Sequence, residues 1–394
     1  MARDVRDRTA RIACPAHARC NAGLAADSAQ ADHPDVDLPR VEVTGVRRNP
    51  RNLHVWFPAV RAGSGADVFT MRLADALRLC GVSATITWFP HWSELAPDLL
   101  RAVRPPAGTD VIHANSAYAF SFRRNGVPLV ATEHHYPLDP AYRPYKSMAQ
   151  HLYHRALIGP YLHRSYACAD AITTDSRFTA DVLRRVAGVE ASRTIPLWVD
   201  YDKFSPAPAA PGSDGRFRLL FVGNASRRKG ADVIPLLGHR LGADFEIRCT
   251  SGLRADRRDG GGGNITLLGR LTEGQLINEY RTCDAVLVPS RYEGFGYTAL
   301  EAMACGKPVV GFRCGAVDEV VAEGETGLLG GIDDLDTLEK NCRRLASDIA
   351  TARAFGQAGR GRATAIFTED RAIDAYLAIY QSLLAGEATN VKTE

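Results

Sequence analysis

Two glutamates, Glu293 and Glu301, have seven residues between them and are strong candidates for binding a polar substrate. The apolar run 284–288 before them predicts a buried strand, and the run after Gly296 predicts a helix. Glu293 then lies in the loop at the carboxyl end of a strand, where open α/β sheets bind ligands. Glu301 lies about two turns into the helix, so both carboxylates can reach one site.

The start of this helix is a candidate anion site. Gly294 and Gly296 flank Phe295, and Gly296 gives the backbone the freedom that a tight turn into a helix requires. The amides of Tyr297 and Thr298, in the first helical turn, then have no carbonyl partner within the helix. Because a helix N-terminus attracts negative charge, this turn predicts binding of a diphosphate.

Basic residues follow a second apolar run, 218–222, which also predicts a strand. Arg227, Arg228 and Lys229 come after a glycine and just before the next predicted helix. A diphosphate that leaves a sugar gains negative charge, and fixed cations stabilise that charge more in the transition state than in the substrate. The segment therefore predicts a phosphate clamp, and the alternative is a solvated basic turn without a ligand.

The segment 289–310, in which glycines and a proline surround the two glutamates, resembles the family 4 glycosyltransferases, or glycosyl transferases group 1. The resemblance covers about residues 52–385 and implies the GT-B fold, an α/β architecture of two Rossmann-like domains facing each other across a cleft. It also implies a retaining enzyme that moves a sugar from a nucleoside-diphosphate sugar to a hydroxyl acceptor. In the family, the counterpart of Glu293 holds the donor sugar hydroxyls and that of Glu301 accepts hydrogen bonds from the ribose.

The basic turn and the nucleobase site follow the same resemblance. Lys229 matches the lysine of the family's phosphate clamp. The usual arginine after the glycine is Asn224 here, which leaves Arg228 or Arg227 as its replacement. The backbone of Leu271 is expected beside the nucleobase.

The first half of the chain supplies a glycine turn and a histidine. Ser64 and Gly65 lie in a Gly-Ser-Gly turn that follows the first predicted strand and opens a helix, and the resemblance implies that this turn approaches the donor phosphate. His134 follows another predicted strand and matches the family's histidine that contacts the donor sugar near the reacting carbon. A purely structural hydrogen-bonding role for His134 is the alternative.

Strands alternate with helices through both halves of the chain, and this alternation predicts two parallel sheets covered on both faces. The predicted parts are a mobile extension 1–48, an N-terminal Rossmann-like acceptor domain 49–204 completed by a C-terminal helix at about 370–385, a Pro- and Gly-rich linker 205–216, and a C-terminal Rossmann-like nucleotide-sugar-binding domain 217–369.

Composition narrows the classes of function. The 394 residues are 45% hydrophobic and carry a formal net charge of +3, with no apolar run long enough to cross a membrane, so a cytoplasmic protein is expected. The basic residues are spread along the chain, which argues against nucleic acid as a partner. Nine scattered cysteines predict reduced thiols, and Cys14, His17 and Cys20 offer only three metal-type ligands.

No cofactor and no metal are expected. Transferases of the other major fold hold the diphosphate through a metal bound by an Asp-x-Asp motif. That motif occurs at Asp35 and Asp37, at Asp200 and Asp202, and at Asp334 and Asp336. The first pair lies in the extension, the second lies at the domain junction, and the third lies at an expected helix start, where Asp334 acts as a cap. Lys229, an arginine and the helix end supply the positive charge instead.

The sequence does not determine the identity of the acceptor, and it leaves some alternative functions open. Basic and aromatic residues mix over 142–164, which predicts either contact with an anionic lipid surface or phosphorylated acceptor, or an ordinary solvated basic face. A Rossmann-type oxidoreductase is disfavoured because the first glycine turn lacks the full Gly-x-Gly-x-x-Gly pattern. Asn224 and Asn115, at positions where the family has basic residues, would suit a catalytically weak scaffold, and a GT-B synthase or phosphorylase is the remaining alternative.

Overall fold

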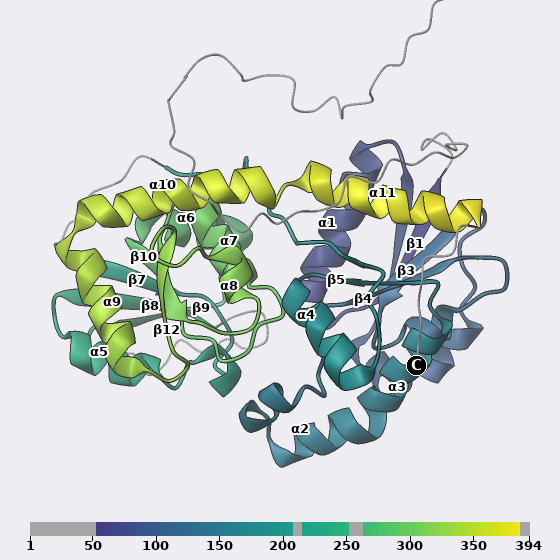
Figure 1. Ribbon diagram of the computed structural model, residues 1–394, viewed down its shortest axis with the longest axis horizontal. Coiled ribbons are helices and arrows are strands. Elements are labelled where there is room, and N and C mark those ends of the chain that lie inside the picture. The colour runs from purple at the N-terminus through teal and green to yellow at the C-terminus, as the bar shows by residue number, and fades with distance from the viewer. Residues whose placement is uncertain (1–52, 208–214, 252–262, 387–394) are drawn as a thin grey trace, which may run out of the picture.

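Two six-stranded parallel sheets organise the chain (Figure 1). The structure is a computed structural model that describes residues 53–207, 215–251 and 263–386. The predicted extension 1–48, which includes Cys14, His17, Cys20 and the Asp35–Asp37 pair, lies outside the described residues. The centre of the predicted linker, 208–214, also lies outside them.

The first sheet has the strand order β2-β1-β3-β4-β5-β6, and each adjacent pair is parallel. Its strands are β1 (His54–Val60), β2 (Ser83–Phe89), β3 (Val111–Asn115), β4 (Leu129–Glu133), β5 (Ala171–Thr174) and β6 (Arg193–Thr194). Its helices are α1 (Gly65–Leu79), α2 (Met148–Tyr153), α3 (Gly159–Cys168) and α4 (Arg177–Val182). Shorter 3₁₀ and π-helical turns are η3 (His91–Glu94), η4 (Pro97–Ala102), η5 (Ala119–Phe122), η6 (Pro140–Tyr145), η7 (His154–Ile158) and η8 (Leu183–Ala187).

The second sheet has the order β12-β11-β10-β7-β8-β9 and is likewise parallel. Its strands are β7 (Phe217–Phe221), β8 (Phe245–Thr250), β9 (Ile265–Gly269), β10 (Ala285–Val288), β11 (Val309–Phe312) and β12 (Gly327–Gly330). The helices are η9 (Arg227–Lys229), α5 (Ile234–Leu241), α6 (Glu273–Thr282), α7 (Tyr297–Ala304), α8 (Val317–Val320), α9 (Leu335–Ser347), α10 (Ile349–Ile366) and α11 (Glu369–Ala385).

Helices cover both faces of each sheet, and this explains why the strand sequences are largely apolar. Every residue of β10 and of β11 is buried, as expected for parallel strands with no face open to water. The prediction of two Rossmann-like α/β domains in a GT-B arrangement is confirmed.

Each sheet has one point at which the chain changes the direction in which it adds strands. In the first sheet this switch point lies between β1 and β3, and in the second it lies between β7 and β10. Because all strands of a parallel sheet end at the same edge, the loops after these strands share one side of the sheet, where ligands bind in open α/β folds. His134 lies in the loop that follows β4 at this edge of the first sheet, and Glu293 lies in the loop that follows β10 at the corresponding edge of the second sheet.

The last two helices run along both domains (Figure 1). α10 packs against α7 of the second domain, and α11 returns to pack against α1 of the first. Tyr380 of α11 is fully buried, and its hydroxyl lies 2.7 Å from Nδ1 of His113 in β3. The C-terminal helix therefore contributes to the core of the first domain.

The cysteines, the lengths of the helices and the cap of α9 also bear on the sequence predictions. The seven cysteines among the described residues are free thiols. Within the same residues, no helix is both long and apolar enough to cross a bilayer. Asp334 caps α9 through the amide of Thr337, as predicted.

Tyr380→Phe tests the attachment of α11. The variant removes the hydroxyl partner of a buried imidazole nitrogen, so we expect a loss of about 1–3 kcal/mol in the free energy of unfolding. Thermal or denaturant unfolding measures this loss. Tyr161→Phe is the matched control, because that hydroxyl bonds to the carbonyl of Leu95 at an exposed position. An equal effect of both substitutions would contradict the assignment.

Candidate active site

The loop 289–296 connects β10 to α7 and carries Glu293. Gly296, the residue before α7, has φ 106° and ψ 54°, a backbone conformation that side chains disfavour. In the first turn of α7, the hydroxyl of Thr298 donates to the carbonyl of Val222, just after β7, at 3.4 Å. The start of α7 therefore lies over the switch point between β7 and β10.

Glu293 is a buried carboxylate held by two cations. Its Oε1 accepts hydrogen bonds from Lys229 Nζ and from Ser290 Oγ, the latter at 2.8 Å, and its Oε2 lies 3.4 Å from Arg228 Nη1. Burial alone would raise the pKa of Glu293, but Lys229, Arg228 and Ser290 outweigh it and lower the pKa to about 2. The group is ionised at neutral pH, and the two cations leave one net positive charge for a ligand.

The basic turn η9 presents its three side chains differently. Ser226 caps the turn by accepting from the amide of Lys229, and Arg291 donates to the carbonyl of Arg227. Arg228 points to the Glu293 loop and also donates to the carbonyl of Tyr292 at 3.0 Å. The side chain of Arg227 is exposed. The structure thus brings Lys229 and Arg228 to Glu293, and it leaves Arg227 at the surface.

Glu301 lies on α7 and has one partner from each domain. Tyr280 donates to its Oε2 at 2.9 Å, and Arg72 Nη2 of α1 lies 3.6 Å from its Oε1. Burial raises the pKa of Glu301, and Arg72 opposes that shift. Arg72 was missed in the sequence, although it follows Gly65 by two helical turns and so shares its face of α1.

The predicted glycine turn of the first domain meets α7 of the second. Ser64 precedes α1, and Asp67 fixes the turn by accepting from the amide of Gly63 at 2.8 Å. A Cβ atom built on Gly65 would lie 3.6 Å from the ring of Tyr297, and the guanidinium of Arg72 lies 5.0 Å from the centroid of the same ring. Ser64, Gly65 and Tyr297 therefore gather where the two domains meet.

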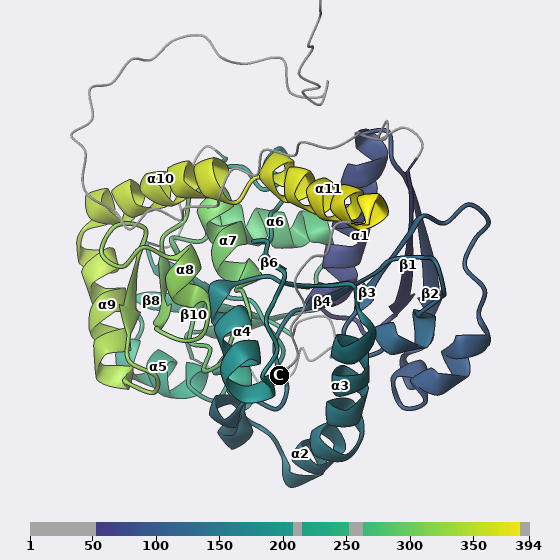
Figure 2. The ribbon, with the colours of Figure 1, turned by 45° about the vertical axis from the view of Figure 1, so that its right-hand side comes forward.

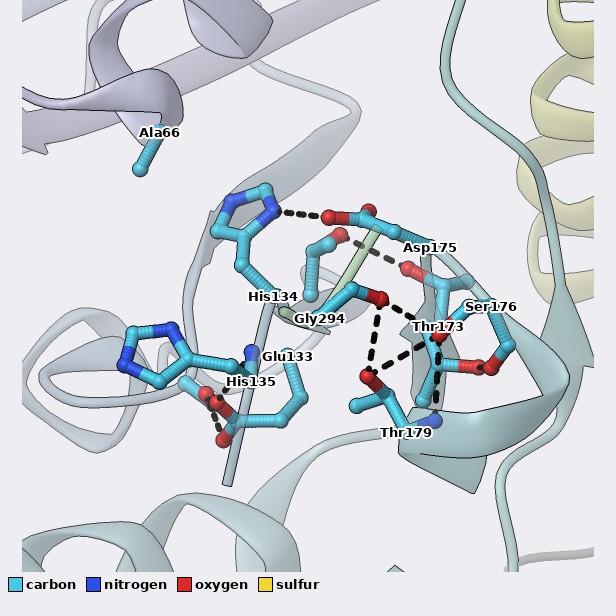
Figure 3. A network of polar contacts seen from close by, with 12 residues as sticks. Ala66, Glu133, His134, His135, Thr173, Asp175, Ser176, Thr179 and Gly294 are labelled. Carbon is cyan, nitrogen blue, oxygen red and sulfur yellow. Dashed lines mark hydrogen bonds and ion pairs between the residues drawn. The ribbon is translucent and has the colours of Figure 1, made fainter. Parts of the chain in front are cut away.

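The Glu293 loop also contacts the first domain directly. A Cβ atom on Gly294 would lie only 1.9 Å from the carbonyl oxygen of His134, so no other residue fits there. The carbonyl of Gly294 accepts hydrogen bonds from Ser176 Oγ at 2.5 Å and from Thr179 Oγ1 at 3.3 Å (Figure 3). His134, Ser176 and Thr179, which follow β4 and β5, thus form the contact surface of this loop, here called its seat.

His134 lies directly after β4, at the same seat. Its Nδ1 is 2.6 Å from Oδ2 of Asp175, and the ring meets Phe69 edge to face at 4.9 Å. Burial lowers the pKa of His134, but Asp175 and Glu133 together more than compensate, and the net shift is upward. The next residue, His135, is exposed.

Two further predicted site residues, Phe295 and Leu271, do not bring their side chains to Glu293. The ring of Phe295 is buried against Phe367, with ring centroids 5.8 Å apart, so only its backbone is available to a ligand. Leu271 lies, partly exposed, in the turn between β9 and α6. Its predicted contact with a nucleobase stays a prediction.

Two family models match the chain. Residues 59–203 match "Glycosyltransferase Family 4", and residues 257–362 match "Glycosyl transferases group 1". A D-inositol 3-phosphate glycosyltransferase of Catenulispora acidiphila is 30% identical over 321 residues, which are 72% of this chain and 75% of that protein. This chain belongs to glycosyltransferase family 4. It is also 29% identical, over 76% of its length and 78% of the relative, to the MMP alpha-(1->4)-mannosyltransferase of Mycolicibacterium hassiacum.

Solved structures share the fold of this glycosyltransferase. Sucrose-phosphate synthase of Thermosynechococcus elongatus superimposes with a TM-score of 0.70 at 21% identity, over 84% of this chain and 99% of that one. HepE of Anabaena, solved in complex with UDP and glucose, gives a TM-score of 0.61 at 16% identity, over 84% of this chain and 98% of that one. These similarities support the GT-B arrangement.

Gly294→Ala tests the seat of the Glu293 loop. The added methyl group overlaps the carbonyl of His134, so the loop must leave Ser176 and Thr179. We expect faster amide hydrogen exchange at Thr179 and a lower midpoint of thermal unfolding. Gly274→Ala is the control, because a Cβ atom there meets nothing within 4 Å and the residue lies in a helix, where alanine is favoured. Unchanged exchange in Gly294→Ala would contradict the seat.

Proposed function

We propose that this glycosyltransferase is a retaining enzyme that needs no metal and moves a sugar from a nucleoside-diphosphate sugar to a hydroxyl acceptor. The observation that carries the proposal is the cluster of Glu293, Lys229 and Arg228, which has a net positive charge and adjoins the start of α7. A diphosphate is the ligand whose charge and size suit two cations and a helix N-terminus.

The donor is arranged along the second domain in this proposal. Its diphosphate lies between Lys229, Arg228 and the amides of Tyr297 and Thr298. The ribose hydroxyls donate to Glu301, which the resemblance assigns to them, and the sugar hydroxyls donate to Glu293. HepE, which shares the fold, was solved in complex with UDP, and this supports a nucleotide as part of the donor.

Fixed cations would replace a metal ion at the leaving group. When the bond between the anomeric carbon and the phosphate oxygen breaks, the diphosphate gains charge, and preorganised cations stabilise that charge without rearrangement. Lys229 is already held in place by Glu293 and by the cap of Ser226. A donor that draws Lys229 toward the phosphate still leaves Arg228 beside Glu293.

The anomeric configuration is retained if the acceptor hydroxyl attacks the anomeric carbon on the same face of the sugar from which the phosphate departs. Glu293 is a poor nucleophile, because two cations and Ser290 already share its oxygens. The departing phosphate would take the proton of the acceptor hydroxyl while the new carbon–oxygen bond forms on the same face. The sugar then keeps its anomeric configuration without a covalent enzyme intermediate.

Transfer assays with EDTA test the proposal. Lys229→Ala and Glu301→Ala should each lose about 3 kcal/mol of transition-state stabilisation, or roughly a hundredfold in rate, whereas EDTA should leave the wild type unchanged. NMR of the product should show the anomeric configuration of the donor. Lys340→Ala is the control, because Lys340 is exposed on α9. Dependence on a divalent ion, full activity of Lys229→Ala, or inverted product would each contradict part of the proposal.

We also propose that the first domain contacts an anionic lipid surface. Two segments of the first domain, 92–99 and 148–157, carry exposed large apolar side chains; they are Trp92, Leu95, Leu99, Met148, Leu152 and Leu157. α3 joins the two segments, since Arg164 pairs with Asp98 and Tyr161 donates to the carbonyl of Leu95. Figures 1 and 2 show α2 at the edge of the molecule opposite α10 and α11.

Charge favours lipid over a neutral partner. Residues 139–168 hold four arginines and lysines, Arg143, Lys146, Arg155 and Arg164, against one acidic residue, the buried Asp139, and the segment 91–102 adds Arg101 against Glu94 and Asp98. A surface with apolar side chains and flanking cations is typical of proteins that lie on anionic membranes.

Vesicle sedimentation tests this contact. The protein should bind phosphatidylglycerol vesicles about tenfold more tightly than phosphatidylcholine vesicles, and Met148→Ser with Leu152→Ser should remove the binding. Leu236→Ser is the control, because Leu236 is equally exposed in the second domain. Equal binding to both lipids, no binding, or self-association that depends on Met148 and Leu152 would overturn the proposal.

A further inference from the structure

Asp175, the residue directly after β5, forms a close pair with His134. The two side chains meet at 2.6 Å, between Oδ2 and Nδ1 (Figure 3). Asp175 is 1% exposed, and its other oxygen, Oδ1, has no hydrogen-bond partner in the described part of the chain. A buried carboxylate with one free oxygen requires a counter-charge, and the imidazole ring is the group in contact that can supply it.

The second nitrogen of the ring is free to act on a ligand. Figure 3 shows His134 with one nitrogen toward Asp175 and the other turned toward Ala66, in the first turn of α1. That turn includes Gly65, which faces Tyr297 of the second domain. His134 also lines a cavity of about 10 Å³ with Phe69 and Asn115, which is room for about one water molecule. Nε2 therefore faces the region where the donor is proposed to bind.

We propose that Asp175 is a positioning residue that keeps Nδ1 of His134 protonated and favours the doubly protonated ring, so that Nε2–H donates to an oxygen of the donor as the glycosidic bond breaks. The inference rests on the proposed function, since it needs a donor at the domain interface. His134 transfers no proton in this step. It contributes a fixed positive charge and a directed hydrogen bond to the transition state.

The groups around His134 decide its charge. Asp175 and Glu133 favour the charged ring, whereas burial disfavours it, and the net effect raises the pKa of His134 above its ordinary value. His113 of β3 is buried, and burial lowers its pKa to about 3, so this ring stays neutral. Tyr376 of α11 and Tyr297 of α7 are close to Asp175 and are uncharged at neutral pH, since burial raises both pKa values.

A pH dependence follows from these shifts. The pKa of His134 is raised on folding, so the charged ring and the stability it contributes are fully present below the unfolded pKa and are lost as the pH rises through the folded pKa. Transfer should decline as the pH rises through the same folded pKa. If Asp175 is replaced by asparagine, the ring loses its counter-charge and the decline should begin at a lower pH.

NMR titration of His134 in Asp175→Asn tests the pair without any substrate, with His134→Gln identifying the signal. The His134 pKa should fall by at least about one unit, which corresponds to roughly tenfold in protonation. Asp181→Asn is the control, because Asp181 is exposed on α4 and pairs with Arg184. An unchanged His134 pKa in Asp175→Asn would overturn the inference, whatever the donor is.

The kinetics of sugar transfer in the same variant provide a second test of the inference. At pH 8, Asp175→Asn should lower kcat by about ten- to a hundredfold with a smaller change in the KM of the donor, and activity should recover toward pH 6. A loss that is equal at every pH would indicate a purely structural role and overturn the inference. Failure of transfer in the wild type, with the NMR shift as expected, would count against the proposed function instead.

Discussion

The burial of the Glu293 carboxylate is the constraint on which the rest of the site depends. A charge in that position must be paired, and its partners, Lys229 and Arg228, lie on a turn that follows a different strand of the same sheet. The pairing keeps Glu293 ionised, with a pKa of about 2, and it holds the two cations beside the start of α7. One interaction thus fixes both the sugar-binding carboxylate and the phosphate-binding charges of the proposed site.

The second domain alone does not complete the site. Arg72 reaches Glu301 from α1, and the Gly294 loop sits on the backbone of His134 and on the hydroxyls of Ser176 and Thr179. Small movements between the domains would change each of these contacts at once. The structure therefore couples the approach of the domains to the geometry around Glu293 and Glu301, which a transferase needs in order to exclude water from the reacting bond.

The sequence predicts those parts of the site that are local. Glu293, Gly296 and Glu301 lie in one strand–loop–helix unit, so their spacing already determines how they face the sheet edge. The roles of Arg72 and Asp175 could not be predicted, because they depend on how two domains or two strands meet, and hydrophobic periodicity contains no such information. The sequence alone did not show which of Arg227 and Arg228 reaches the site; in the structure the side chain of Arg228 contacts Glu293, whereas that of Arg227 is exposed. The alternation of strands and helices was enough for the fold, since buried parallel strands are apolar throughout.

Calorimetric titration of nucleoside diphosphates in EDTA tests the central claim most directly, because it isolates the phosphate site from the acceptor. Among UDP, GDP, ADP and TDP, at least one should bind without a divalent ion. The affinity for that nucleotide should fall by roughly ten- to a hundredfold in Lys229→Ala, as expected for loss of a charged hydrogen bond. Binding that requires a divalent ion, or that is unaffected by Lys229→Ala, would contradict a metal-independent site built on Glu293, Lys229 and Arg228.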